Sequence, residues 1–183
     1  MILLRHGQSE FNAVYSLTRV DPGIADPRLT AEGRQQAKLA AAALGAAGVR
    51  RLISSPYTRT LETAALVAEA LQIEVSVEPL VRERAAFACD IGAPPAELKR
   101  RFPRFDFDHL EDPWWHDHIA LGIAESEAAL IARCAAFRDA MSATADWREV
   151  GVVTHWGFIR AMTGRTLTNG ELVRIEISGA PAV

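Results

Sequence analysis

The regular alternation of short apolar runs with longer helical segments is the feature that most constrains the fold of this chain. The apolar runs are residues 1–5, 50–55, 73–77 and 148–155. Strands that alternate with helices form a largely parallel sheet whose two faces are both covered by helices. We therefore predict an α/β fold, a three-layer αβα sandwich with a mostly parallel central sheet.

The helical segments between these runs carry their own start and stop signals. Thr30 is placed to cap a helix that Gly48 ends. Ser55 and Pro56 predict the start of a second helix, because proline at the first helical position loses no hydrogen bond. A third helix is indicated by apolar residues at helical spacing, which are Leu130, Cys134, Phe137 and Met141.

Two segments depart from this pattern. Residues 171–177 alternate apolar and polar side chains, which predicts an edge strand that can run antiparallel. Residues 84–123 hold four of the nine prolines together with Trp114 and Trp115. We expect this stretch to be a cap-like insertion with one short helix, lying over the carboxyl edge of the sheet in a single domain that spans residues 1–183. The two tryptophans either anchor the insertion in the core or grip the substrate.

Composition narrows the range of partners. The 183 residues, 49% of them hydrophobic, suffice for one well-buried core. The balance of 20 Lys and Arg against 23 Asp and Glu favours neither a nucleic-acid surface nor a membrane patch, so we expect a small-molecule partner. We also expect no cofactor. Without a visible signal peptide, and with Cys89 and Cys134 predicted to be free thiols, a cytoplasmic location is expected. The oligomeric state stays open.

Polar side chains occur where the predicted strands end. Arg5 and His6 close the first strand, and His155 closes the run at 148–155. Arg59 lies in the first turn of the helix after the second strand, and Glu83 follows the third. Because the carboxyl ends of parallel strands meet at one edge of a sheet, we expect these five side chains to converge.

Such a set suits phosphoryl transfer. Two guanidinium groups can bind phosphate oxygens, a neutral imidazole can attack phosphorus, and a carboxyl group can protonate the departing oxygen. No metal is needed to offset the phosphate charge, and we predict no metal site. A group of His and Asp side chains in the insertion matches no established metal-binding spacing; its members are His109, Asp112, His116, Asp117 and His118.

Three motifs together resemble the histidine phosphatase superfamily, which includes the cofactor-dependent phosphoglycerate mutases. They are "LLRHGQSEFN", "LISSPYTRTLETA" and "VVTHWGFIRAMTG", and "DPRLTAEGRQQA" is similar to a further family segment. The resemblance implies that His6 is the phosphorylated nucleophile. It also implies that Arg5, Arg59 and His155 bind the transferred phosphoryl group.

The same resemblance assigns further positions. Glu83 matches the general acid, with Glu78, five residues earlier, as the competing carboxylate. Asn12 is implied to line the phosphate pocket, and Ser9 to touch its substrate side. Trp156 stands where many relatives carry glycine, which predicts a bulkier wall beside the substrate.

The leading hypothesis is a metal-independent phosphatase that hydrolyses a small-molecule phosphomonoester through a phosphohistidine at His6. A phosphoglycerate-type phosphomutase is one alternative, although such enzymes are usually longer chains. A phosphoprotein phosphatase is another, which a shallow pocket would favour. A catalytically silent module that binds phosphorylated ligands is the third, and the intact set of His and Arg side chains argues against it.

Overall fold

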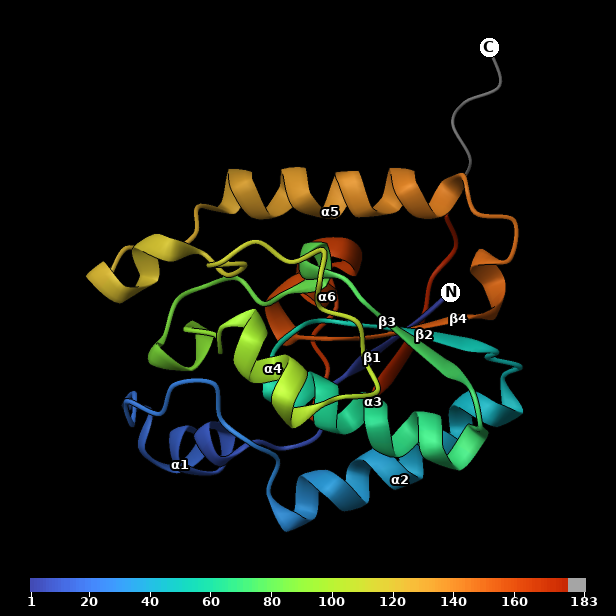
Figure 1. The fold of residues 1–183 in the computed structure, drawn as a ribbon, viewed down its shortest axis with the longest axis horizontal. Helices are drawn as coiled ribbons and strands as arrows, with labels where there is room; N and C mark the ends of the chain where they lie inside the picture. The colour runs from blue at the N-terminus through green and yellow to red at the C-terminus, as the bar shows by residue number, and fades with distance from the viewer. Residues whose placement is uncertain (178–183) are drawn as a thin grey trace.

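The computed structural model describes residues 1–177 and has a five-stranded sheet between two layers of helices (Figure 1). The strands are β1 (Ile2–Arg5), β2 (Arg51–Ser54), β3 (Glu74–Val77), β4 (Val150–Thr154) and β5 (Leu172–Arg174). The helices are α1 (Glu10–Thr18), α2 (Ala31–Ala46), α3 (Thr58–Leu71), α4 (Pro95–Arg101), α5 (Glu127–Ser142) and α6 (Trp156–Thr163). The predicted fold class is confirmed. No helix within residues 1–177 has the length and apolar character to cross a membrane.

The strand order is β3-β2-β4-β1-β5, and every neighbouring pair is parallel except β1 with β5. The last strand therefore lies at an edge and runs antiparallel, as its alternating pattern predicts. Its strand geometry covers only Leu172–Arg174 of the expected seven residues.

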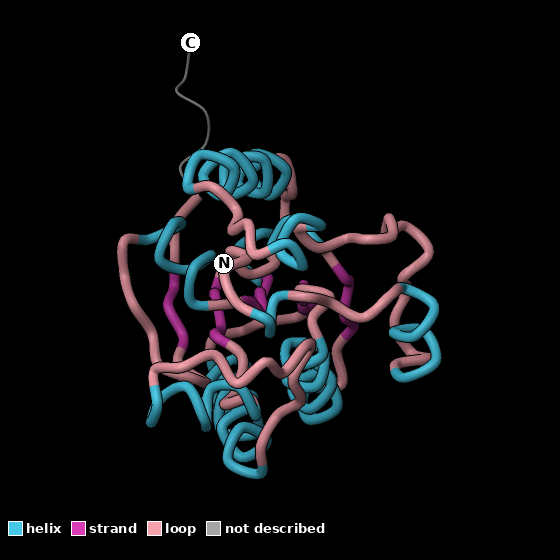
Figure 2. The backbone as a smooth tube through the Cα atoms, turned by 90° about the vertical axis from the view of Figure 1, so that its left-hand side faces the viewer, coloured by secondary structure: helices cyan, strands magenta, loops and turns pink. Residues whose placement is uncertain are grey.

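Alternate side chains of β1 point to opposite faces of the sheet and join two separate cores. Leu3 packs with Phe137 of α5 and Phe158 of α6, whereas Leu4 packs with Leu44 of α2. This period of two is the geometry of an extended strand, and both of its faces are apolar because helices cover both. Figure 2 shows the strands between the two helical layers.

The start of α3 lies later than the sequence predicts. Ser55 and Pro56 do not begin the helix: its first residue is Thr58, and Tyr57 precedes it without a side-chain cap. The Ser55 amide instead donates to Val153, which continues the sheet pairing. The N-terminus of α3 is capped from a distant loop, because the Asp26 carboxylate accepts from the Thr58 amide at 2.8 Å. Local capping signals cannot reveal a cap supplied by tertiary contact.

Other helix signals are confirmed. The Thr30 hydroxyl accepts from the Gly33 amide at the start of α2, and Gly48 adopts a positive φ just beyond its end. The apolar stripe of α5 is buried as predicted. Helices α1 and α6 were not predicted, and each begins within four residues of a histidine that directly follows a strand. They span nine and eight residues, too few for a clear apolar period.

The segment at 84–123 packs beside α3 and β3 and contains α4. Trp114 is buried in the third core cluster, where its ring meets Tyr57 edge-on at 4.7 Å and its indole N–H donates to the Ala93 carbonyl. Trp115 packs on the same cluster. His109 bonds the carbonyl of Val77 at the end of β3. The tryptophans are therefore anchors of the segment rather than groups that grip a ligand.

The close contact between Gly33 of α2 and the backbone of Gln8 gives a test of how tightly the loop after His6 packs against α2. A Cβ at Gly33 would overlap the backbone carbonyl of Gln8, which lies just after His6. We expect Gly33→Ala to lower the free energy of unfolding by about 2 kcal/mol or more, since two backbone segments would have to separate. Denaturant unfolding measures this change.

Gly45→Ala is the matched control in the same helix. Its Cβ would meet only the flexible end of Leu71, at 2.9 Å, and alanine favours helix over glycine. We expect this variant to be neutral or stabilised. Equal destabilisation of both variants would contradict the close loop contact.

Candidate active site

The register of the central strands brings two histidines together. Arg5 of β1 lies opposite Thr154 of β4, so the next residues, His6 and His155, leave the sheet side by side. Their ring centroids are 5.1 Å apart at an interplanar angle of 61°, and both side chains are buried. The predicted convergence of these two residues follows directly from parallel pairing.

The hydrogen bond of His6 fixes its tautomer. Its Nδ1 lies 2.8 Å from the carbonyl oxygen of Gly7. Because a carbonyl only accepts, Nδ1 must carry the proton, which leaves a lone pair on Nε2. Burial, with the nearby charges of Arg59 and Arg5, holds the pKa of His6 well below its usual range. The ring is therefore neutral at pH 7. The lone pair on Nε2 is suited to nucleophilic attack.

Arg59 is held by a buried ion pair. One guanidinium nitrogen donates to Asp90 Oδ1 at 3.0 Å and another to the carbonyl of Cys89 at 2.7 Å. The other carboxylate oxygen of Asp90 accepts from the amides of Ala86 and Phe87. The first residues of the insertion are thereby tied to Arg59, and the guanidinium is fixed in position.

Two buried nitrogens near His6 have no partner among residues 1–177. They are Nε of Arg5, whose Nη1 donates to the Leu167 carbonyl, and Nδ1 of His155, whose Nε2 lies 2.8 Å from the Ser55 hydroxyl. Buried polar groups are normally paired, so unpaired ones are candidates for ligand contacts. Burial and the charge of Arg59 lower the pKa of His155 well below its usual value.

Glu83 carries a carboxyl group whose proton is available near neutral pH. Its Oε1 accepts from the amides of Arg84 and Gly157, both at 2.8 Å. Burial, reinforced by the charge of Asp90, raises the pKa of Glu83 to about 7. The competing Glu78 instead caps the amide of Leu80. The structure thus places Glu83, and not Glu78, beside the histidines.

These groups surround a cavity of about 240 Å³. Its walls are formed by Arg5, His6, Ser9, Phe11, Asn12, Arg59, Glu83, Arg84, Ala86, Phe87, Cys89, Asp90, Trp156 and Gly157. Seven of the eight site residues predicted from the sequence are in this set. His155 is the exception: it packs behind His6 and does not line the cavity.

Ser9 and Asn12 are joined to each other at the start of α1. The Ser9 side chain caps the helix, and Asn12 Oδ1 accepts from both the amide and the hydroxyl of Ser9. A third donor to the same oxygen is the side-chain nitrogen Nδ2 of Asn169, which also donates to the His6 carbonyl. Ser9 and Asn12 therefore organise the loop after His6 as well as lining the cavity.

Several residues of the site have no signal in the sequence. Asp90, Arg84 and Phe87 lie in the insertion, where no motif distinguishes them from surface residues. Asn169 precedes Gly170, a pairing that indicates a turn but not contact with His6. Only the folded chain places these side chains at the carboxyl edge of the sheet.

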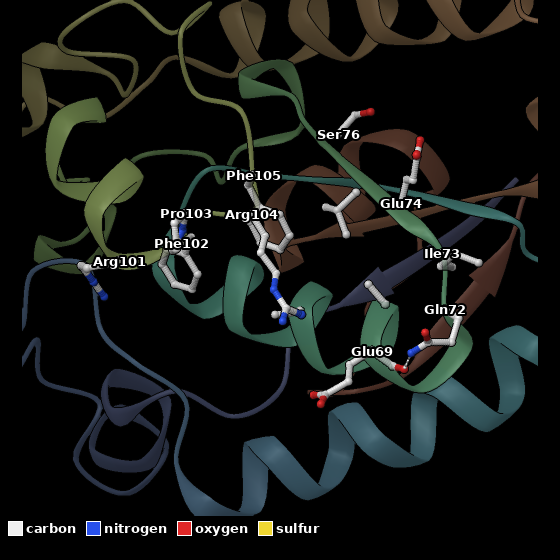
Figure 3. Close-up of a pocket in the computed structure, with 13 residues that line it drawn as sticks. Glu69, Gln72, Ile73, Glu74, Ser76, Arg101, Phe102, Pro103, Arg104 and Phe105 are labelled. Carbon is white, nitrogen blue, oxygen red and sulfur yellow. Dashed lines mark hydrogen bonds between the residues drawn. The ribbon is translucent and has the colours of Figure 1, made fainter.

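Two other features lie away from this cavity. A larger groove of about 680 Å³ runs between α3, β3 and residues 101–105, and contains none of the predicted catalytic groups (Figure 3). In the insertion, His116, Asp117 and His118 have potential ligand atoms within 4.8 Å of one another. His109 does not belong to that group of potential ligands. Neither feature contains Arg5, His6, Arg59 or Glu83.

Comparison with known proteins identifies the family. The sequence model of the histidine phosphatase superfamily (branch 1) matches residues 1–179. The chain belongs to this superfamily. Phosphoserine phosphatase 1 of Hydrogenobacter thermophilus is 31% identical to this chain over 162 residues. These residues are 88% of this chain and 73% of the relative.

Other matches cover different shares of this chain and of the relative. A protein named probable phosphoglycerate mutase from Serratia proteamaculans is 40% identical over 81 residues, which are 44% of this chain and 36% of that relative. The match thus spans about a third of that protein. The structure of a mycobacterial glucosyl-3-phosphoglycerate phosphatase has the same fold, with a TM-score of 0.65 and 23% identity, covering 94% of this chain and 88% of that one.

The Asp90–Arg59 pair predicts a large effect of a single substitution. We expect Asp90→Ala to lower the free energy of unfolding by about 3 kcal/mol, because it leaves a buried guanidinium without its counter-charge and two amides without an acceptor. Asp90→Asn, which keeps an acceptor oxygen, should cost less. Denaturant unfolding measures both.

Asp146→Ala is the control, since it removes the partner of Arg51 in an exposed ion pair. Its effect on the unfolding midpoint should be far smaller. A similar loss in Asp146→Ala and Asp90→Ala would show that burial of the pair does not matter.

Proposed function

We propose that this histidine phosphatase superfamily member is a metal-independent phosphatase that hydrolyses a small-molecule phosphomonoester through a phosphohistidine at His6. The observation that carries the proposal is the unprotonated Nε2 of a neutral, buried His6 in a cavity that Arg5 and Arg59 also line. Relatives named as phosphatases support hydrolysis as the reaction class.

In the first step, Nε2 of His6 attacks phosphorus and the bond from phosphorus to the alcohol oxygen breaks. Glu83, whose pKa burial raises to about 7, gives its proton to that oxygen. Arg5 and Arg59, which both line the cavity, bind the non-bridging oxygens. Nδ1 of His6 keeps its proton throughout and donates it in the hydrogen bond to the Gly7 carbonyl.

In the second step, water attacks phosphorus and the bond to Nε2 breaks. The Glu83 carboxylate left by the first step takes a proton from that water, which restores the starting state of both residues. Inorganic phosphate is released. The two guanidinium groups offset the phosphate charge in both steps, so the proposal needs no metal ion.

A phosphoglycerate mutase is the second candidate, because relatives with that name share up to 40% identity with part of the chain. The two activities differ in the acceptor of the phosphoryl group. Incubation with 3-phosphoglycerate and a bisphosphoglycerate primer gives 2-phosphoglycerate from a mutase and inorganic phosphate from a phosphatase. We expect phosphate release, and isomerisation faster than release would favour the mutase.

The nucleophile can be tested by trapping. We expect wild-type protein in excess chelator to turn over p-nitrophenyl phosphate, and a radiolabelled phosphate ester to leave an acid-labile, alkali-stable label on the protein. His6→Ala should lose the label and at least about 1000-fold in kcat/KM. Folded His6→Ala that kept its rate would exclude His6, whereas folded wild type that binds phosphate without turnover would favour the binding-module alternative.

The raised pKa of Glu83 predicts an unusual pH profile. A carboxyl group that stays protonated up to about pH 7 can act as an acid below that pH, and its activity is lost as the pH rises through 7. We expect kcat/KM, corrected for substrate ionisation, to fall about tenfold per unit above pH 7. The lowered pKa of His6 places the acidic limb well below 6.5.

Glu83→Gln should abolish that alkaline limb. The variant should lose about 100-fold or more on an alkyl phosphate, and much less on p-nitrophenyl phosphate, whose leaving group needs little protonation. An equal loss on both esters would argue against an acid role for Glu83.

A further inference from the structure

The catalytic cavity changes character from its floor to its mouth. The floor holds the charged and polar groups around His6 described above. The exposed lining residues mark its mouth: Ala86, Phe87 and Trp156 are apolar, and Arg84 adds a charge. Phe11 and Gly157 also line the cavity but are buried. The alcohol half of a phosphomonoester, which projects away from the phosphoryl group, therefore meets the apolar part of the cavity.

Phe87 is an open aromatic surface that is held in place. Its side chain is 37% exposed although it lines a cavity. Its ring centroid lies 5.6 Å from that of Phe11 and 5.1 Å from that of Tyr15, both in α1. A ligand that covers Phe87 would bury apolar surface without first having to order the ring.

Trp156 provides a second such surface from another element. It begins α6, is 38% exposed, and has the guanidinium of Arg160 5.2 Å from its ring centre. Gly157 beside it leaves no room for a side chain, because a Cβ there would overlap Glu83. Trp156 and the proposed acid Glu83 therefore line the same cavity, and the residue after Trp156 donates its amide to Glu83.

The mouth has few groups left to bind a polar alcohol. The amides of Arg84 and Gly157 donate to Glu83, and those of Ala86 and Phe87 donate to Asp90. A sugar or polyol would lose its hydrogen bonds to water here and regain few, which is unfavourable. Arg84 is exposed and can contact the ligand edge, but one cation does not replace a set of hydroxyl partners.

We propose that the preferred substrate is the phosphate monoester of a small aromatic alcohol, with its ring against Phe87 and Trp156. This inference rests on the proposed function, because the phosphoryl group must first be seated at His6. The cavity volume of about 240 Å³, below the roughly 300 Å³ at which pockets for drug-sized ligands begin, suits a phosphate group with a single ring.

The test compares esters with similar leaving groups. Benzyl, ethyl and glycerol phosphates all release primary alcohols, so differences among them report chiefly on contacts with the mouth. We expect the KM of benzyl phosphate to be about tenfold lower than that of ethyl phosphate, with kcat within a fewfold. Phe87→Ala and Trp156→Ala should each reduce the benzyl-to-ethyl ratio of kcat/KM by about fivefold. Phe87→Leu should keep part of the preference.

Phe105→Ala is the matched control, because it removes the same side chain from the separate groove of Figure 3. It should leave the benzyl-to-ethyl ratio unchanged. Equal kcat/KM for benzyl and ethyl phosphate, or a preference for glycerol phosphate, overturns the inference while the phosphatase proposal stands.

Binding separates the two proposals if turnover is absent. Benzylphosphonate and methylphosphonate can be titrated calorimetrically against the wild type without any reaction. Tighter binding of benzylphosphonate by about tenfold, lost in Phe87→Ala, would support the aromatic mouth even if His6 formed no phosphoenzyme. Equal affinity for both phosphonates would contradict it, whatever the activity.

Discussion

The parallel pairing of β1 with β4 is the constraint on which the rest of the structure depends. Its register sets Arg5 opposite Thr154, and the residue after each is a histidine. The same sheet pairs β2 with β4, which brings the Ser55 hydroxyl to His155. A shift of one residue between β1 and β4 would separate the two imidazole rings, and a shift between β2 and β4 would separate Ser55 from His155. Either shift would also turn alternate side chains to the wrong core. Fold and candidate site thus share one set of backbone hydrogen bonds.

The site concentrates groups whose charged forms are costly to bury. Burial lowers the pKa of both histidines and raises that of Glu83, while Arg59 is stabilised by Asp90. Such an arrangement costs folding stability, and sites of this kind are where proteins accept that cost. In exchange, a neutral imidazole and a protonated carboxyl group coexist within one small cavity near neutral pH, which is the combination that acid-assisted phosphoryl transfer requires.

Sequence reasoning succeeded where the signal was local and failed where partners were distant. The parallel strands are found because helices bury both of their faces, which leaves continuous apolar runs. The start of α3 was misplaced because its cap is Asp26, more than thirty residues away. The sequence left open whether the two tryptophans of the insertion pack in the core or contact the substrate. The edge-on contact of Trp114 with Tyr57 places Trp114 in the core. Helices α1 and α6 are too short to carry a distinct period.

The sequence by itself determined the layered α/β fold, the family, and the set of histidines and arginines at the strand ends, because strand periodicity and motif order are written in consecutive residues. Only the tertiary structure decided which acid holds Arg59, which tautomer His6 adopts, that Glu83 rather than Glu78 faces the cavity, and that Phe87 and Trp156 form its mouth. These depend on contacts between segments far apart in the chain, whose distances and burial no local pattern encodes.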